Sequence, residues 1–142
     1  TGIDPDVRAL EYARSRATPP TVQFCKATST ELVQAGKKFD IIISNHVLHH
    51  LLNDEVYALC KVSEQLANKF VLHNDIRRSG LAYAGFSLTK LVFRKSFTTE
   101  DGLLSIRRSF TASELQNVVP SQWYVEPMIP YRNLLIYEGD RK

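Results

Sequence analysis

The chain has 142 residues, of which 44% are hydrophobic and 23% are charged, ordinary values for one globular domain. These values argue against a disordered, collagen-like or coiled-coil protein. A formal net charge of +3 is too small for a dedicated nucleic-acid-binding protein. No span approaches the roughly 20 apolar residues of a membrane helix, so we expect neither a nucleic-acid partner nor stable membrane insertion. Cys25 and Cys60 lack disulfide-framework and zinc-site spacing, which predicts reduced thiols in a cytoplasmic protein.

Predicted strands and helices alternate along the first half of the chain. In order, they are a strand end at 1–4, a helix from 5 to about 16, a β-rich segment at 21–26, a turn or short helix at 28–35, and a strand at 39–44. Pro5 suits the first turn of the first helix, which Asp4 could cap. Three consecutive isoleucines at 41–43 predict a strand that is buried on both faces.

The second half continues the alternation and ends on two strands. It is predicted to contain a helix at 53–68, a strand at 70–73, helices at 81–94 and 111–118, and strands at 123–127 and 134–137 that form a hairpin. The aromatic-rich helix 81–94 suits core packing or a dimer interface. The alternatives are an apolar substrate pocket and contact with a membrane surface that supplies the substrate. The pattern predicts an α/β fold with a Rossmann-like, mostly parallel sheet, helices on both faces and a C-terminal antiparallel hairpin.

Polar residues gather where the predicted parallel strands end, and ligands bind at this edge of open α/β sheets. Asp4 follows the first strand, and its carboxylate suits a ribose diol because both oxygens accept hydrogen bonds. The alternative for Asp4 is a plain helix cap. Asn45 and His46 follow the strand at 39–44, and Asp75 follows the strand at 70–73.

Three histidines within five residues, His46, His49 and His50, raise the question of a metal site. His46 and His50 have the spacing of ligands on one helix face. The surrounding sequence matches no zinc motif, however, so we predict no metal.

Two stretches together resemble the class I S-adenosylmethionine-dependent methyltransferases, in the methyltransferase-domain and quinone-biosynthesis-like form. They are GIDPD at 2–6 with ALEYAR at 9–14, and FDIIISNHVLHHL at 39–51. The resemblance implies S-adenosylmethionine as the cofactor and assigns site residues to three strand ends. These are Gly2, Asp4 and Pro5 at the ribose, Thr28 and Ser29 beside the adenine, and Asn45 and His46 facing the methionine part and the acceptor. Ala27 and Thr28 stand where the family usually has an acid.

The family's glycine-rich loop is not found in this sequence, whose six glycines lie at 2, 36, 80, 85, 102 and 139. In the family, the strand before that loop lies at the centre of the sheet. We therefore expect residues 1–142 to be a single, N-terminally truncated methyltransferase-like domain that lacks its first strand and helix, with two unpaired sheet edges.

The resemblance implies methyl transfer to a small-molecule acceptor, such as a hydroxyl or activated carbon of an aromatic or quinone-like compound. A hydroxyl acceptor must lose a proton, for which His46 is the first candidate base, with His73 and Asp75 second. His49 and His50 are expected to pack locally. The alternatives are a non-catalytic or degenerate domain that acts in binding or assembly, and a nicotinamide-dependent enzyme. Self-association into a homodimer stays open.

Two basic pairs, at 77–78 and 107–108, are expected to form solvated surface. The alternative is that these arginines contact an acidic substrate or a phosphate.

Overall fold

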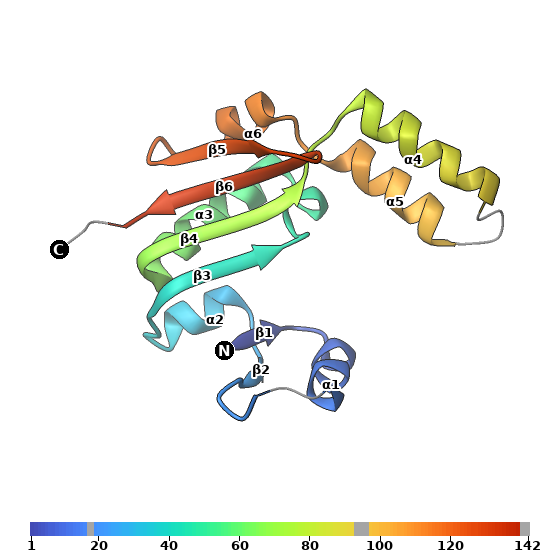
Figure 1. Ribbon diagram of the computed structural model, residues 1–142. Coiled ribbons are helices and arrows are strands. Elements are labelled where there is room, and N and C mark those ends of the chain that lie inside the picture. Colours follow the sequence, from blue (N-terminus) through green and yellow to red (C-terminus); the bar gives the residue numbers. More distant parts are fainter. Residues whose placement is uncertain (17–18, 93–96, 140–142) are drawn as a thin grey trace. The chain divides into compact units, whose positions relative to one another are not determined.

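The computed structural model describes residues 1–16, 19–92 and 97–139, without the side chains of 88–92 and 97–99 (Figure 1). The described residues form two compact units, 1–38 and 39–142, each of which is described by itself. Cys25 is exposed in the first unit, and Cys60 is buried in the second. No helix of the described residues has the length and apolar character needed to cross a membrane.

The first unit contains two short parallel strands and two helices. These are β1 (Gly2–Asp4), α1 (Val7–Ser15), β2 (Phe24–Lys26) and α2 (Ser29–Gln34). Gly2 is needed for the pairing, because a Cβ there would lie 2.9 Å from the ring of Phe24. Helix α1 begins two residues after Pro5, and Asp6 caps it by accepting from the backbone N–H of Arg8. The expectation that Asp4 caps this helix is therefore wrong.

The second unit is built on a four-stranded sheet with the order β3-β4-β6-β5. The strands are β3 (Phe39–Asn45), β4 (Ala67–Ile76), β5 (Trp123–Met128) and β6 (Arg132–Glu138). Strand β4 runs parallel to β3 and antiparallel to β6, and β5 and β6 form the predicted antiparallel hairpin. The predicted α/β class and the C-terminal hairpin are confirmed.

The helices of the second unit are η1 (Leu48–His50), α3 (Asn53–Leu66), α4 (Gly80–Val92), α5 (Phe97–Arg108) and α6 (Ala112–Val118). The last two residues predicted for helix 81–94, Phe93 and Arg94, lie outside the described residues. Helix α5 is not among the elements that the sequence predicts. Thr111 caps α6 through the capping box with Glu114 that the sequence predicts.

One hydrophobic core lies between the sheet of the second unit and helices α3 and α6. It is formed by Leu48, Val56, Cys60, Val71, Leu115, Val119, Trp123 and Leu135, with Ile42 packed against it. On the opposite face of β3, the side chains of Ile41 and Ile43 are 58% and 68% exposed. The expectation that this strand is buried on both faces is therefore wrong, because within its sheet β3 is an edge strand with helices packed on one face.

Candidate functional site at the carboxyl ends of β3 and β4

The parallel pairing of β3 and β4 brings two asparagines side by side at their carboxyl ends. Asn45 is in register with Asn74, and the Asn74 Nδ2 donates to Asn45 Oδ1 at 2.8 Å. The next residue, His46, donates its backbone N–H to the Asn74 carbonyl at 2.9 Å. The chain then turns into η1, and His46 itself adopts a left-handed conformation with φ of 59°.

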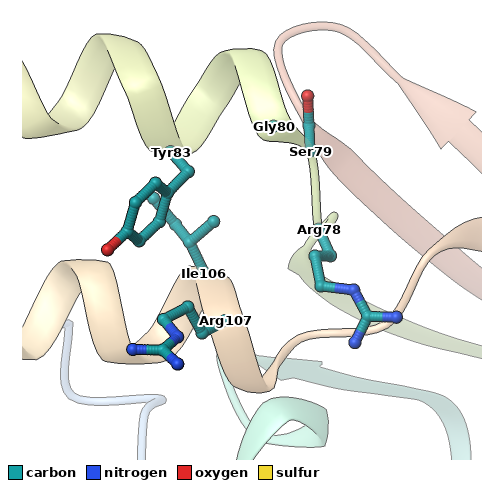
Figure 2. Close-up of a pocket in the computed structure, with 6 residues that line it drawn as sticks. All are labelled: Arg78, Ser79, Gly80, Tyr83, Ile106 and Arg107. Atoms are coloured by element: carbon teal, nitrogen blue, oxygen red, sulfur yellow. The ribbon is translucent and has the colours of Figure 1, made fainter.

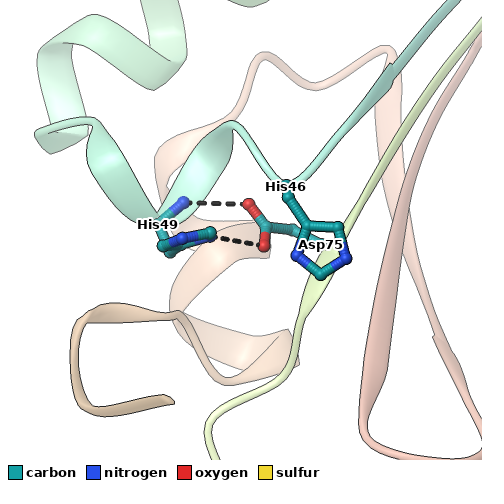
Figure 3. Close-up of side chains that lie close together, drawn as sticks. All are labelled: His46, His49 and Asp75. Carbon is teal, nitrogen blue, oxygen red and sulfur yellow. Dashed lines mark hydrogen bonds and ion pairs between the residues drawn. The ribbon is translucent and has the colours of Figure 1, made fainter. Parts of the chain in front are cut away.

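A buried histidine–aspartate pair connects η1 to the end of β4 (Figure 3). Asp75 Oδ2 accepts from the backbone N–H of His49 at 2.9 Å, and Oδ1 lies 2.7 Å from His49 Nδ1. Both side chains are at most 5% exposed. Because a carboxylate only accepts hydrogen bonds, His49 Nδ1 carries the proton in the neutral ring, and its lone pair is on Nε2. Sequence reasoning missed this pair because the two residues lie 26 positions apart.

His46 is held by a cation rather than by a carboxylate. Its Nε2 lies 2.8 Å from Arg132 Nη1 of β6, and since arginine can only donate, Nε2 accepts. Burial lowers the pKa of His46, and the charge of Arg132 lowers it further. The lone pair that a general base needs is therefore already engaged, which argues against the prediction of His46 as first candidate base.

His46, His49 and Asp75 also offer metal-ligand atoms within 4.8 Å of one another. This differs from the pairing of His46 with His50 that the sequence suggests. Arg132 is a fixed positive charge at the same cluster, and it opposes the binding of a second cation. We therefore assign no metal to these residues.

His73 lies within the core rather than at the edge of the sheet. It is 1% exposed, its Nδ1 and Nε2 lie 2.7 Å and 3.2 Å from the hydroxyls of Ser44 and Ser63, and its ring stacks on Trp123. Because both nitrogens are occupied, this geometry gives His73 a structural part and argues against a base there. Burial lowers its pKa to about 4.

This buried ring predicts that the protein loses stability in mild acid. In the unfolded chain His73 has an ordinary pKa of about 6.5, so it takes up a proton there before the folded state does. The contribution of His73 to stability should therefore fall by about 3 kcal/mol as the pH falls from 7 to 4, and should change little below that. Urea denaturation at several pH values measures this effect. The slope should be smaller in His73→Gln and unchanged in His50→Gln, whose histidine is exposed. Equal slopes in all three proteins would contradict the assignment.

The site residues predicted in the first unit lie at the ends of β1 and β2. Asp4 Oδ1 accepts from the Asp6 N–H at 2.7 Å, and within the described residues nothing donates to its Oδ2. Thr28 forms a capping box with Glu31 at the start of α2, and Ser29 is the first residue of that helix. The carboxylate of Asp4 therefore keeps one oxygen for a ligand, whereas the Thr28 hydroxyl is engaged.

A pocket of about 710 Å³ lies between α4 and α5, beside the segment that follows β4 (Figure 2). It is lined by Arg78, Ser79, Gly80, Tyr83, Ile106 and Arg107. The basic pairs at 77–78 and 107–108 thus each contribute one arginine to the same pocket.

The family described as "Methyltransferase domain" matches residues 1–72 of the chain. These residues contain both stretches that carry the resemblance in the sequence. Among curated proteins, no sequence matches.

Several solved structures share the fold at low sequence identity. The plantazolicin methyltransferase BpumL, solved with a triazolic desmethylPZN analog and SAH, has a TM-score of 0.70 at 13% identity, over 99% of this chain and 67% of that one. The plantazolicin methyltransferase BamL has a TM-score of 0.57 at 21% identity, over 82% and 42%. A protein from Bordetella parapertussis, titled a possible exported protein, has a TM-score of 0.58 at 14% identity, over 97% and 52%.

The chain spans between about two fifths and two thirds of these solved chains. The family match covers half of the chain, and the fold agrees with it. The chain therefore belongs to the methyltransferase-domain family, within the class I S-adenosylmethionine-dependent methyltransferases.

Proposed function

We propose that the protein transfers a methyl group from S-adenosylmethionine to a small-molecule acceptor, namely a hydroxyl or activated carbon of an aromatic or quinone-like compound. The family match over residues 1–72 is the observation that carries this proposal. The plantazolicin methyltransferases, which have the same fold, were solved with SAH, the product form of that cofactor. We further propose that residues 1–142 act as one methyltransferase-like domain.

In each unit taken by itself, the residues at the strand ends carry groups that suit such a cofactor. The free Oδ2 of Asp4 suits a ribose hydroxyl, with Gly2 in the strand before it and Pro5 in the bend after it. Thr28 and Ser29 would lie at the adenine, through backbone groups because the Thr28 side chain is engaged. Asn45 and His46 would face the methionine part. When bound, the cofactor supplies an electrophilic methyl group, and the protein's task is to align an acceptor with it.

His49, rather than His46, is the residue we propose as the base for a hydroxyl acceptor. Asp75 fixes the ring so that the proton is on Nδ1 and the lone pair is on Nε2. In this arrangement Nε2 can take the acceptor's proton, and the buried carboxylate stabilises the cation that forms. Asp75, which the sequence suggests as a base, thus becomes the positioning residue for His49.

Removing the carboxylate of Asp4 should weaken cofactor binding. In Asp4→Asn, we expect the Kd for S-adenosylhomocysteine, measured by calorimetry, to rise by about 10- to 100-fold, since a hydrogen bond to a charged group contributes about 1.5–3 kcal/mol. Asp6→Asn is the matched control, because Asp6 lies in the same turn but is paired with Arg8. Equal weakening in both variants would contradict the assignment. Saturable binding without methylation of any phenolic acceptor would favour a domain that binds but does not catalyse.

A further inference from the structure

The pocket between α4 and α5 has the size and the position of a small-molecule site. Its volume of about 710 Å³ lies within the range of ligand pockets, about 300–1,000 Å³. It begins at Arg78, three residues after Asp75, and so follows the carboxyl end of β4, where open α/β sheets bind ligands. The backbone N–H groups of Arg77 and Arg78 donate to the carbonyls of Tyr131 and Phe110 at 2.7 and 3.0 Å. This segment of the wall is therefore fixed to the rest of the unit.

The charge of the pocket is positive and only partly compensated. Two of its six lining residues are arginines, and none is acidic. Arg78 forms an ion pair with Glu114, which is not part of the lining. Within the described part of the chain, Arg107 has no ion-pair partner, and its side chain is exposed. Arg107 is thus a guanidinium at the pocket that is available to a carboxylate or phosphate, which it can bind through two parallel hydrogen bonds.

The remaining lining residues suit a flat ring. Tyr83 comes from α4 and Ile106 from α5 (Figure 2), and they offer an aromatic and an aliphatic surface. At Gly80, the first residue of α4, a Cβ would meet nothing within 4 Å, so the glycine adds open space rather than a packing contact. The pocket therefore combines apolar surface for a ring with a cation for an anionic substituent.

We propose that this pocket binds the methyl acceptor, and that the acceptor is a small aromatic compound carrying an anionic group that Arg107 recognises. The identification of the bound compound as the methyl acceptor rests on the proposed methyltransferase function. The binding of an aromatic anion is inferred from the residues that line the pocket and does not depend on that function. The proposal also names a substrate class, because neutral and cationic compounds would not gain the paired hydrogen bonds that Arg107 offers to an anion.

Three compounds that share one ring and differ in charge test the proposal on the 142-residue chain. Benzoate, benzyl alcohol and benzylamine are titrated while backbone amide shifts are followed by NMR. We expect saturable shifts at α4 and α5 with benzoate, and at least about tenfold weaker binding of the other two, the effect of one charge-assisted hydrogen bond. Arg107→Gln should weaken benzoate binding by about tenfold for the same reason, and Arg107→Lys should restore part of it.

Arg108→Gln is the matched control, because Arg108 is an exposed neighbour on α5 that does not line the pocket. Unchanged benzoate binding in this variant supports the proposal, whereas an equal loss in both glutamine variants would show a diffuse charge effect and overturn it. Non-saturable shifts, or benzyl alcohol binding as well as benzoate, would overturn it too. S-adenosylhomocysteine binding is measured separately in each variant, so failure of the pocket and failure of the methyltransferase assignment give different results.

Discussion

His49→Gln is expected to slow methyl transfer to a hydroxyl acceptor by about 10²- to 10⁴-fold, the usual contribution of a positioned base. Glutamine has nearly the length of histidine and keeps a polar group beside Asp75, but it cannot accept the proton. The measurement is the transfer of labelled methyl groups to a panel of phenols, with S-adenosylhomocysteine affinity determined on the same samples. Unchanged affinity with reduced turnover would locate the effect in the chemical step.

Two neighbouring histidines serve as controls for this result. His50 lies in the same short helix but is exposed, and His46 already binds Arg132 through Nε2. His50→Gln and His46→Gln should therefore each change the rate much less than His49→Gln. Asp75→Asn tests the positioning residue: its rate should fall, and the acid limb of the pH–rate profile should move. A larger loss of rate in His46→Gln than in His49→Gln would identify His46, rather than His49, as the base.

Trp123→Ala is expected to lower the free energy of unfolding by about 3–5 kcal/mol, the usual cost of truncating a fully buried large aromatic side chain. Trp123 is 1% exposed and packs between His73 and Tyr137, with ring centroids at 5.5 and 5.3 Å. Its Nε1 also donates to Glu64 Oε1 at 2.8 Å. Truncation would leave a cavity and remove this hydrogen bond, although the Glu64 carboxylate would keep its ion pair with Lys61.

Urea denaturation followed by circular dichroism measures this loss. The matched control is Tyr124→Ala, one residue further along β5, where the aromatic ring points to the other face and is 43% exposed. Its expected cost is below about 1 kcal/mol, because its ring is partly exposed and its hydroxyl makes an exposed hydrogen bond to Glu138. Similar losses in the two variants would show that Trp123 does not anchor the core.

Most of the element order could be predicted from the sequence, because hydrophobic spacing and capping signals are local, but helix α5 was not among the predicted elements. The Thr111–Glu114 capping box and the strands of the hairpin are examples. The prediction that the isoleucine run at 41–43 is buried on both faces is wrong, because such a run is buried on both faces only where other elements cover both faces of the strand. Within its sheet, Ile41 and Ile43 lie on a face without such cover.

The site was predictable in location but not in its pairings. Strand ends are marked by polar residues such as Asn45 and Asp75, so the edge could be found. Which residues bond there depends on the register of β3 with β4 and on the turn at η1. The register and the turn bring Asp75 into contact with His49. They also place His46 beside Arg132 of β6, which lies 86 positions further along the chain. A local pattern contains no such information.

The two cysteines make the protein convenient for site-selective labelling. Burial raises the pKa of the Cys60 thiol to about 12, so almost no thiolate forms there at neutral pH, and reagents cannot reach it. Cys25 is exposed. A maleimide dye should therefore attach to Cys25 in the folded protein and mark residues 1–38, whereas modification of Cys60 would report the opening of 39–142. One native sequence thus provides a separate optical probe for each unit, without any engineered residue.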